Sequence, residues 1–167
     1  MTDYSTRFGL LPISDAQVWH CVAPLPGFAE LQRFTLLHVQ EQGPFVWLQS
    51  LDEPLIAFLL VAPEHFGLHY PQRPQFAAQA TNGISMVMVI LPQKTNDSLL
   101  QANALAPLYF LPHTRQFGQW IVEHAEPSLT NISEAQTPPA TLGVPIIQLG
   151  LARRDSTTAS PLAIGAA

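Results

Sequence analysis

The sequence is poor in cysteine and in charge. Its 167 residues include one cysteine, Cys21, so no disulfide can form within the chain. Cys21 lies in the mostly apolar run 18–22, where a thiol is far more often buried and inert than reactive. Charged residues make up 11% of the chain against 47% hydrophobic ones, which excludes disorder for the main body and predicts a single core.

Basic residues are too few for a nucleic-acid interface. Seven Lys and Arg are spread along a chain of net charge −5, with no basic stripe that could neutralise phosphates. No direct nucleic-acid partner is therefore expected. A mildly acidic surface instead favours encounter with basic patches on other proteins.

No apolar run approaches the roughly 20 residues that span a bilayer. The longest candidates are residues 55–62 and 86–91. The first seven residues also lack the basic start and apolar stretch of a secretory signal. We therefore expect a cytoplasmic protein with no membrane partner.

Sequence motifs for catalysis and nucleotide binding are missing. The chain has no Gly-x-Ser-x-Gly elbow, and its nine glycines are dispersed without the spacing of a phosphate loop. Asp52 and Glu53 are adjacent carboxylates before Pro54, where solvated side chains with unremarkable pKa values are expected rather than a tuned acid and base. We expect no enzyme, no catalytic residue and no cofactor.

Six histidines raise the question of a metal site. His65 and His69 are four residues apart, a spacing that brings two imidazoles together only on a helix. Pro63 and Pro71 bracket this pair, and Glu64 precedes the first histidine instead of following it. No metal site is expected.

Short runs of β-branched and aromatic residues, bounded by Pro, Gly, Asn or Asp, predict an all-β fold. The fold class expected is a small antiparallel β-barrel-like or sandwich-like domain with one short helix and a mobile C-terminal tail. The predicted strands are 18–22, 34–39, 45–51, 55–61, 84–91, 99–102, 108–111 and 119–124, with a further short one at 7–12. The strand at 84–91 is apolar on both faces, which places it in the interior of the barrel or sandwich.

Two segments depart from the strand pattern. Phe76–Ala80 predicts about two helical turns before Asn82-Gly83. From residue 132 onward Thr, Ala, Pro and Ser predominate, which predicts a domain at 1–131, a mobile tail at 132–167, and a domain that folds without this tail. The apolar island Val144–Leu149 can dock on a partner, a symmetry mate or the body.

Several segments occur in an order and spacing that resemble the FliW family of flagellar assembly factors. They are Thr6-Arg7-Phe8-Gly9, Leu25-Pro26-Gly27-Phe28, residues 47–54 with Ala57-Phe58, residues 102–107, and Gly118 to Val122. The resemblance covers roughly residues 5–125. The chain departs from the family pattern at Ala29, at the short segment 71–78 and at the ending 125–128.

The resemblance implies a monomeric, chaperone-like adaptor in the cytoplasm. Proteins of this family bind flagellin and, when flagellin is exported, bind the translational repressor CsrA and antagonise it allosterically, which relieves repression of flagellin synthesis. The motif positions that we expect to contact a partner are Phe8, Gln49, Asp52, Glu53, Asn103 and Pro107. A rival reading is a β-barrel that holds a small ligand or acts as an enzyme on an unknown substrate, and a third is an interaction protein whose flagellar role has been lost.

Structural roles are expected for other motif residues. Leu25, Pro26, Gly27 and Phe28 predict a turn in which Gly27 takes a positive φ and the two apolar side chains enter the core. The amide of Gln49, in an apolar strand, is expected to clamp neighbouring backbone.

Overall fold

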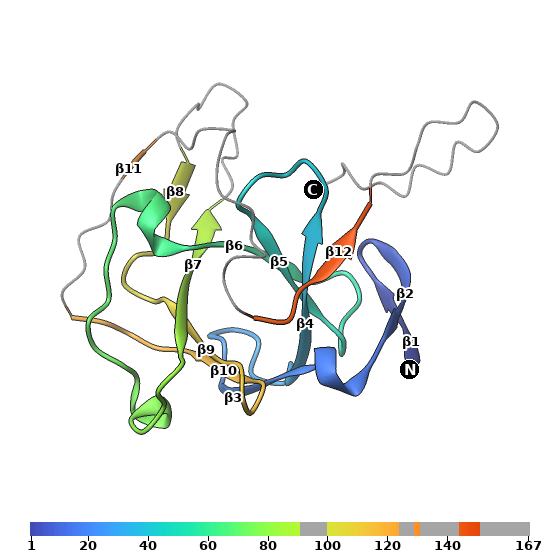
Figure 1. Cartoon of the computed structure of the whole chain (residues 1–167), viewed down its shortest axis with the longest axis horizontal. Helices are drawn as coiled ribbons and strands as arrows, with labels where there is room; N and C mark the ends of the chain where they lie inside the picture. The colour runs from blue at the N-terminus through green and yellow to red at the C-terminus, as the bar shows by residue number, and fades with distance from the viewer. Residues whose placement is uncertain (91–99, 124–128, 131–143, 151–167) are drawn as a thin grey trace.

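The computed structural model describes residues 1–90, 100–123, 129–130 and 144–150. These residues form strands and three short 3-10 helices, with no α-helix among them (Figure 1). None of their helices has the length and apolar character that crossing a membrane would require. The strands are β1 (Thr2–Thr6), β2 (Gly9–Ile13), β3 (Trp19–Ala23), β4 (Arg33–Val39), β5 (Val46–Ser50), β6 (Ala57–Val61), β7 (Ile84–Ile90), β8 (Leu100–Ala102), β9 (Leu108–Leu111), β10 (Gln116–Gln119), β11 (Leu129–Thr130) and β12 (Ile147–Leu149).

Seven of the strands close into a barrel. Antiparallel pairs run from β7 through β6, β5 and β4 to β3, and β3 then pairs in parallel with β10. β10 pairs with β9, and β9 returns to β7 with Ile84 opposite Phe110, which completes the ring. The predicted all-β, barrel-like fold is confirmed, although the ring is not wholly antiparallel.

Packed side chains fill the barrel interior. The main core cluster is built around aromatic and branched residues that the barrel strands point inward: Trp19, Phe34, Leu36, Leu48, Leu60, Met86, Leu108, Phe110 and Phe117. Phe110 stacks on Phe117, with ring centroids 5.0 Å apart. On β7, Met86 belongs to this cluster while its neighbour Val87 belongs to a second one under the helix Pro63–Phe66, so β7 is covered on both faces as its sequence predicts.

A hairpin at the amino terminus covers the outer face of β4 and β5. The short strand predicted at 7–12 is present as β2, but the prediction missed β1, which pairs with β2 around a turn at Arg7-Phe8. Thr6 Oγ1 accepts a hydrogen bond from Phe8 N–H at 3.0 Å and donates to Gly9 O at 2.7 Å, and Gly9 takes a φ of 102°. Phe8 then packs its ring edge-on against Trp47.

The predicted strand at 119–124 is also misplaced. β10 occupies Gln116–Gln119, and residue 124 lies outside the described residues. Gly118 allows β10 to pass close to β3: a Cβ on Gly118 would lie 2.5 Å from Ala23 Cβ, and the register shifts at this point. Residues 120–122 continue along the chain as extended backbone beyond the strand.

The predicted helix is shorter than expected. Only Gln75–Ala77 form a 3-10 turn, after Pro74 at the N-cap position. In residues 75–79, a 3-10 helix followed by a turn replaces the two α-helical turns that the Ala-Gln composition favours.

Of the alternatives for the island Val144–Leu149, the structure shows docking on the body. Ile147, Gln148 and Leu149 form β12, which pairs in parallel with Leu37–Val39 of β4. Val144 is 9% exposed and joins the main core cluster. Residues 131–143 and 151–167, on which the predicted domain boundary and mobile tail fall, lie outside the described residues.

Candidate functional site: an apolar groove on the barrel

A tight turn between β3 and β4 builds one wall of a groove. Phe28 N–H donates to Leu25 O at 2.8 Å, and Gly27 has a φ of 84°, so the predicted turn with a positive φ is confirmed. Leu25 is 2% exposed and anchors the turn in the core. Phe28, predicted to be in the core, is only half-buried. Its ring packs edge-on against that of Phe58 of β6, with ring centroids 5.2 Å apart.

The segment Asn103–Pro107 builds the facing wall. Asn103 N–H donates to Met88 O at 2.8 Å, which ties the segment to β7. On its other side, Trp120 N–H donates to Pro107 O at 3.1 Å and Val122 N–H donates to Leu105 O at 2.9 Å. The segment is therefore fixed on both sides by backbone hydrogen bonds. The side chain of Asn103 has no hydrogen-bond partner within the described part of the chain.

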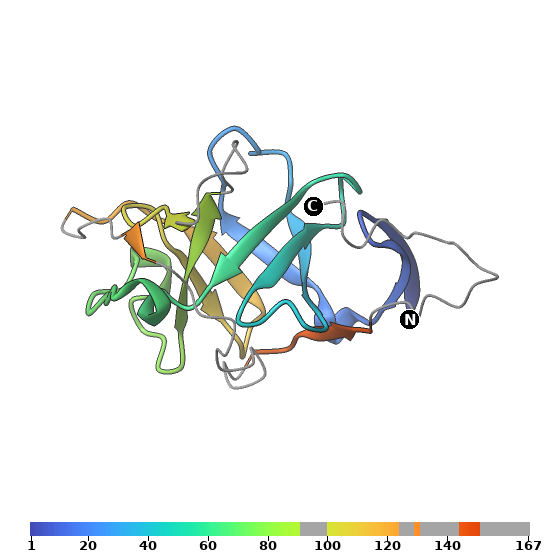
Figure 2. The same cartoon turned by 90° about the horizontal axis from the view of Figure 1, so that it is seen from above.

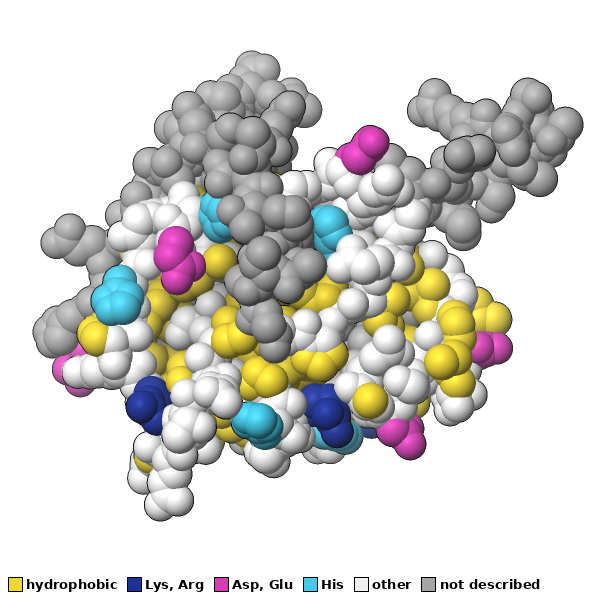
Figure 3. Space-filling model, in the orientation of Figure 1, with side chains coloured by type: hydrophobic (Ala, Val, Ile, Leu, Met, Phe, Trp, Pro, Cys, Tyr) yellow, Lys and Arg dark blue, Asp and Glu magenta, His cyan; other side chains and the backbone are white. Residues whose placement is uncertain are grey.

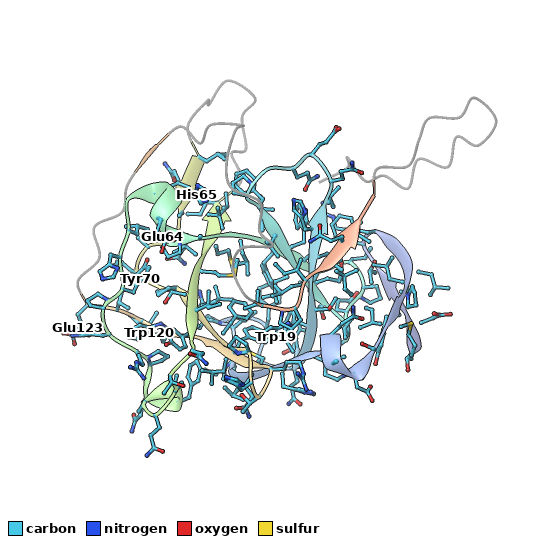
Figure 4. The ribbon with its side chains drawn as sticks, in the orientation of Figure 1. Trp19, Glu64, His65, Tyr70, Trp120 and Glu123 are labelled. Atoms are coloured by element: carbon cyan, nitrogen blue, oxygen red, sulfur yellow. The ribbon has the colours of Figure 1, made fainter. Side chains whose placement is uncertain are left out.

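Two further side chains support this wall. Gln119 Nε2 donates to Ala106 O at 2.9 Å, and Tyr70 Oη donates to Ala104 O at 2.6 Å. Partial burial of Tyr70 raises the pKa of its phenol to about 12, so the hydroxyl stays a donor at neutral pH. Figure 4 shows Tyr70 and Trp120 on the same side of the molecule, away from Trp19 among the barrel strands. The indole N–H of Trp120 is buried and has no hydrogen-bond partner among the described residues, which costs free energy.

Between the two walls lies a groove of about 520 Å³. Its lining brings together five segments that are far apart in the sequence and carries no charged side chain. The lining residues are Leu25, Pro26, Phe28, Phe58, Met88, Asn103, Leu105, Ala106, Gln119 and Ile121. Leu105 and Ile121, which are 44% and 70% exposed, stand on the rim as apolar groups in water.

The chemistry of this lining suits binding and not catalysis. It contains no nucleophile, acid or base, and only the amides of Asn103 and Gln119 interrupt the apolar surface. Such a surface gains free energy by taking apolar side chains out of water. The nearby Cys21 is half-buried and donates to Ala23 O, and burial raises the pKa of its thiol, so it is a poor nucleophile.

Gln49 clamps the turn between β5 and β6. Its amide nitrogen donates to Ser50 O at 2.8 Å, to Pro54 O at 2.9 Å and to Ile56 O at 3.3 Å, while its Oε1 accepts from Arg7 N–H at 3.1 Å. The prediction that it clamps neighbouring backbone is confirmed. Because Gln49 is fully buried, it offers no surface for direct contact with a partner.

Asp52 forms an ion pair and is not simply solvated. Its carboxylate accepts two bonds from the guanidinium of Arg33, at 2.9 and 3.0 Å, and two from the backbone N–H groups of Gln32 and Arg33. Burial raises the pKa of this carboxyl, but the hydrogen bonds from Arg33 and Gln32 outweigh burial and hold the pKa of Asp52 below its ordinary value. The expectation of an unremarkable pKa is therefore wrong for Asp52. Glu53 is exposed beside it.

The remaining predicted positions divide by burial. Phe8 and Pro107 are buried like Gln49, so their contribution is to packing. Only Asp52, Glu53 and Asn103 present side chains that a partner can touch directly. The motif-based prediction included the segments of Leu105 and Ile121 but not these two residues as contacts, because their exposure depends on how the segments are arranged in space.

Charged and metal-binding groups do not gather on the described surface. No group of three or more His, Cys, Asp or Glu side chains comes together among the residues that the structure describes. His65 lies on the helix Pro63–Phe66 and His69 is exposed beyond it. Charged side chains are scattered singly over the face seen in Figure 3, where hydrophobic side chains show between them.

Comparison with known proteins places the chain among flagellar assembly factors. Residues 2–132 match the family model described as FliW protein. The flagellar assembly factor FliW of Syntrophotalea carbinolica is 30% identical over 128 residues, which cover 72% of this chain and 89% of that protein. FliW 2 of Desulfotalea psychrophila is 30% identical over 129 residues, covering 73% and 83%. A crystal structure of the flagellar assembly factor FliW matches the fold with a TM-score of 0.66 at 24% identity, covering 78% of this chain and 96% of that one.

Proposed function

The chain belongs to the FliW family, and we propose that it is a cytoplasmic, non-catalytic adaptor that binds flagellin through the groove between the Leu25–Phe28 turn and the Asn103–Pro107 segment. After flagellin is exported, the freed adaptor binds the translational repressor CsrA and antagonises it allosterically, so that flagellin synthesis resumes.

One observation carries the proposal: several of the segments that match the family line a single groove. The Leu-Pro-Gly-Phe turn, Phe58, the segment 102–107 and the segment 118–122 are separated in the sequence, yet all contribute to its lining. Some of these residues are explained by packing. The exposed Leu105 and Ile121 are not, because leaving them in water stabilises nothing in the fold.

The character of the groove favours an apolar protein segment as its occupant. An uncharged lining with two amides can bury leucine-sized or methionine-sized side chains and hydrogen-bond the backbone that carries them. We propose that this segment is the export-competent, apolar part of flagellin before it assembles. Asp52, Glu53 and Asn103 remain the proposed polar contacts at the edges of the interface.

The rival ligand-binding barrel has less support. Its ligand would occupy the barrel interior, but buried side chains such as Trp19, Phe34 and Met86 already occupy that space.

The test is calorimetric titration of purified flagellin into the full chain and into Leu105→Asp and Ile121→Asp. Each charge placed on the rim should weaken binding at least about tenfold, because it must be desolvated in the complex. The matched control is Leu10→Asp on the β1–β2 hairpin, because Leu10 is about as exposed (68%) as Ile121 (70%). This variant should bind within about twofold of the unchanged chain. Equal binding by all three variants would refute the groove as the flagellin site.

The CsrA half of the proposal has its own measurement. Flagellin added to a complex of the chain with CsrA should release CsrA in proportion to the flagellin bound. A stable ternary complex would contradict the partner switch.

A further inference from the structure

The edge of β4 is shared between two neighbours. β3 pairs only with the start of β4, placing Trp19 opposite Phe34 and His20 opposite Arg33. β12 takes the place beside the second half, Leu37–Val39, and Gln40 N–H donates to Leu149 O at 2.8 Å just beyond the ladder. Without β12, the backbone N–H and C=O groups along this half of the edge would lack a strand partner among the described residues.

The covering strand lies outside the part of the chain that defines the family. The FliW match ends at residue 132, so it includes β4 and not Val144–Leu149. The barrel edge therefore belongs to the shared fold, whereas its cover belongs to the extension of this chain. Figure 2 shows β12, in red, on the side of the barrel opposite the blue turn between β3 and β4 that forms the groove.

β12 is held by a short set of contacts. Its ladder has three residues, Ile147 and Leu149 are only half-buried, and Gln148 is exposed, so Val144 is the one side chain of the segment that is buried in the main core cluster. Docking closes a loop between β11 and Val144, and loop closure costs conformational entropy that opposes docking. A segment with these properties is suited to reversible release.

The resident strand also defines the chemistry that fits the edge. Ile147 and Leu149 pack against the outer cluster of Phe8, Leu37, Val39 and Trp47, while Gln148 Oε1 lies 2.7 Å from His38 Nδ1. A ligand must therefore be extended, run parallel to β4, and carry two apolar side chains on either side of a hydrogen-bonding one.

We propose that the β4 edge at Leu37–Val39 is a strand-addition site for an extended apolar segment of a partner protein, and that Val144–Leu149 is its built-in competitor. This inference rests on the proposed function only in taking the partner to be a protein. Binding of the partner segment displaces β12, so the extension raises the partner concentration needed to occupy the edge.

The probe is a fluorescent peptide with the sequence Gly-Val-Pro-Ile-Ile-Gln-Leu-Gly, titrated into the full chain and into the full chain carrying Ile147→Asp and Leu149→Asp. Two carboxylates cannot enter the outer cluster, so the double variant releases its strand. The variant should bind the peptide at least about tenfold more tightly than the unchanged chain, whose tethered strand competes at an effective concentration in the millimolar range. A peptide with the same Ile→Asp and Leu→Asp changes is the control and should not bind.

Amide hydrogen exchange on the unchanged chain tests the proposal without any variant. The Gln40 amide, bonded to Leu149 O, should exchange at least about tenfold faster than the Ser50 amide, which bonds to Ile56 O at 2.9 Å within the barrel. Equal protection of the two amides, no peptide binding by the variant, or a dimer formed by exchange of β12 between two copies would each overturn the proposal. None of these measurements uses flagellin, so their failure is distinct from failure of the groove proposal.

Discussion

Replacing Gln49 with leucine should destabilise the barrel by removing the clamp on the β5–β6 turn. Leucine has a similar volume, so the change removes hydrogen bonds without opening a large cavity. Three of the four bonds of the Gln49 amide are 2.8 to 3.1 Å long, and the fourth, to Ile56 O, is 3.3 Å. At about 1 kcal/mol of net stabilisation for each short bond, the loss is about 3 kcal/mol.

The loss should be measured by urea denaturation at neutral pH, followed by tryptophan fluorescence. The matched control is Gln32→Ala, because the side chain of Gln32 is exposed and its hydrogen bonds, to Asp52 and from Cys21 N–H, involve only its backbone. The control should change the free energy of unfolding by less than about 0.5 kcal/mol. A Gln49→Leu variant as stable as the control would refute the reasoning, since it would mean that the amide contributes no net free energy.

A charged isostere adds a check on the same clamp. Gln49→Glu keeps the acceptor for Arg7 N–H but turns a carboxylate oxygen toward the carbonyls of Ser50 and Pro54. Protonation of that carboxyl relieves the repulsion, so its pKa in the folded state is raised. The stability deficit relative to the unchanged chain should therefore be largest at neutral pH and shrink as the pH falls toward about 4.

The remaining predictions concern Asp52 and Gly118. Because the pKa of Asp52 is lowered in the folded state, the stabilisation from its ion pair is present above the ordinary aspartate pKa of 3.8 and disappears as the pH falls through the folded-state pKa. Asp52→Asn should lower the free energy of unfolding by roughly 1 kcal/mol at pH 7, a modest value because the pair is solvent-exposed, and by less near pH 3, whereas Glu53→Gln should change little at either pH. Gly118→Ala should lower the melting temperature by several degrees, because its Cβ would meet Ala23 Cβ at 2.5 Å and Ala23 N at 3.0 Å; a melting temperature equal to that of the unchanged chain would show that β3 and β10 separate freely.

The barrel strands were predictable where alternation and burial agree. β4, β5, β7 and β9 fall within a residue or two of their predicted bounds, because their apolar side chains must be buried whichever neighbour they find. Gln49 was predictable for a related reason, since a buried amide must find partners wherever it lies. The turn at Gly27 followed from backbone sterics alone.

The predictions that were wrong concern segments where tertiary contacts override the local conformational preference of the sequence. β10 contains Gly118, and a glycine weakens the sequence pattern of a strand. Glycine is needed at this position because β10 passes too close to Ala23 for a residue with a side chain. Trp120 and Ile121 look like strand residues and instead support and line the groove. β12 is as apolar as a core strand, but no sequence rule specifies that its partner is the edge of β4 more than a hundred residues earlier.

The groove was beyond sequence reasoning for a different reason. Each lining segment has a sufficient structural explanation by itself: a tight turn, a barrel strand, a backbone-bonded segment or an extended run. Only their arrangement in space leaves Leu105 and Ile121 without one.

The two proposed surfaces lie on opposite sides of one barrel, and this geometry limits how they can interact (Figure 2). A segment in the groove and a strand on the β4 edge do not overlap, so any antagonism between them must pass through the barrel. β4 connects the two regions along the chain: it begins at Arg33, shortly after the groove turn, and ends beside β12. If occupation of the groove shifts β4, it changes the affinity of the edge, and thermodynamic linkage then requires occupation of the edge to change the affinity of the groove by the same factor. For the partner exchange proposed above, β4 is therefore the element through which the two proposed binding events would be coupled.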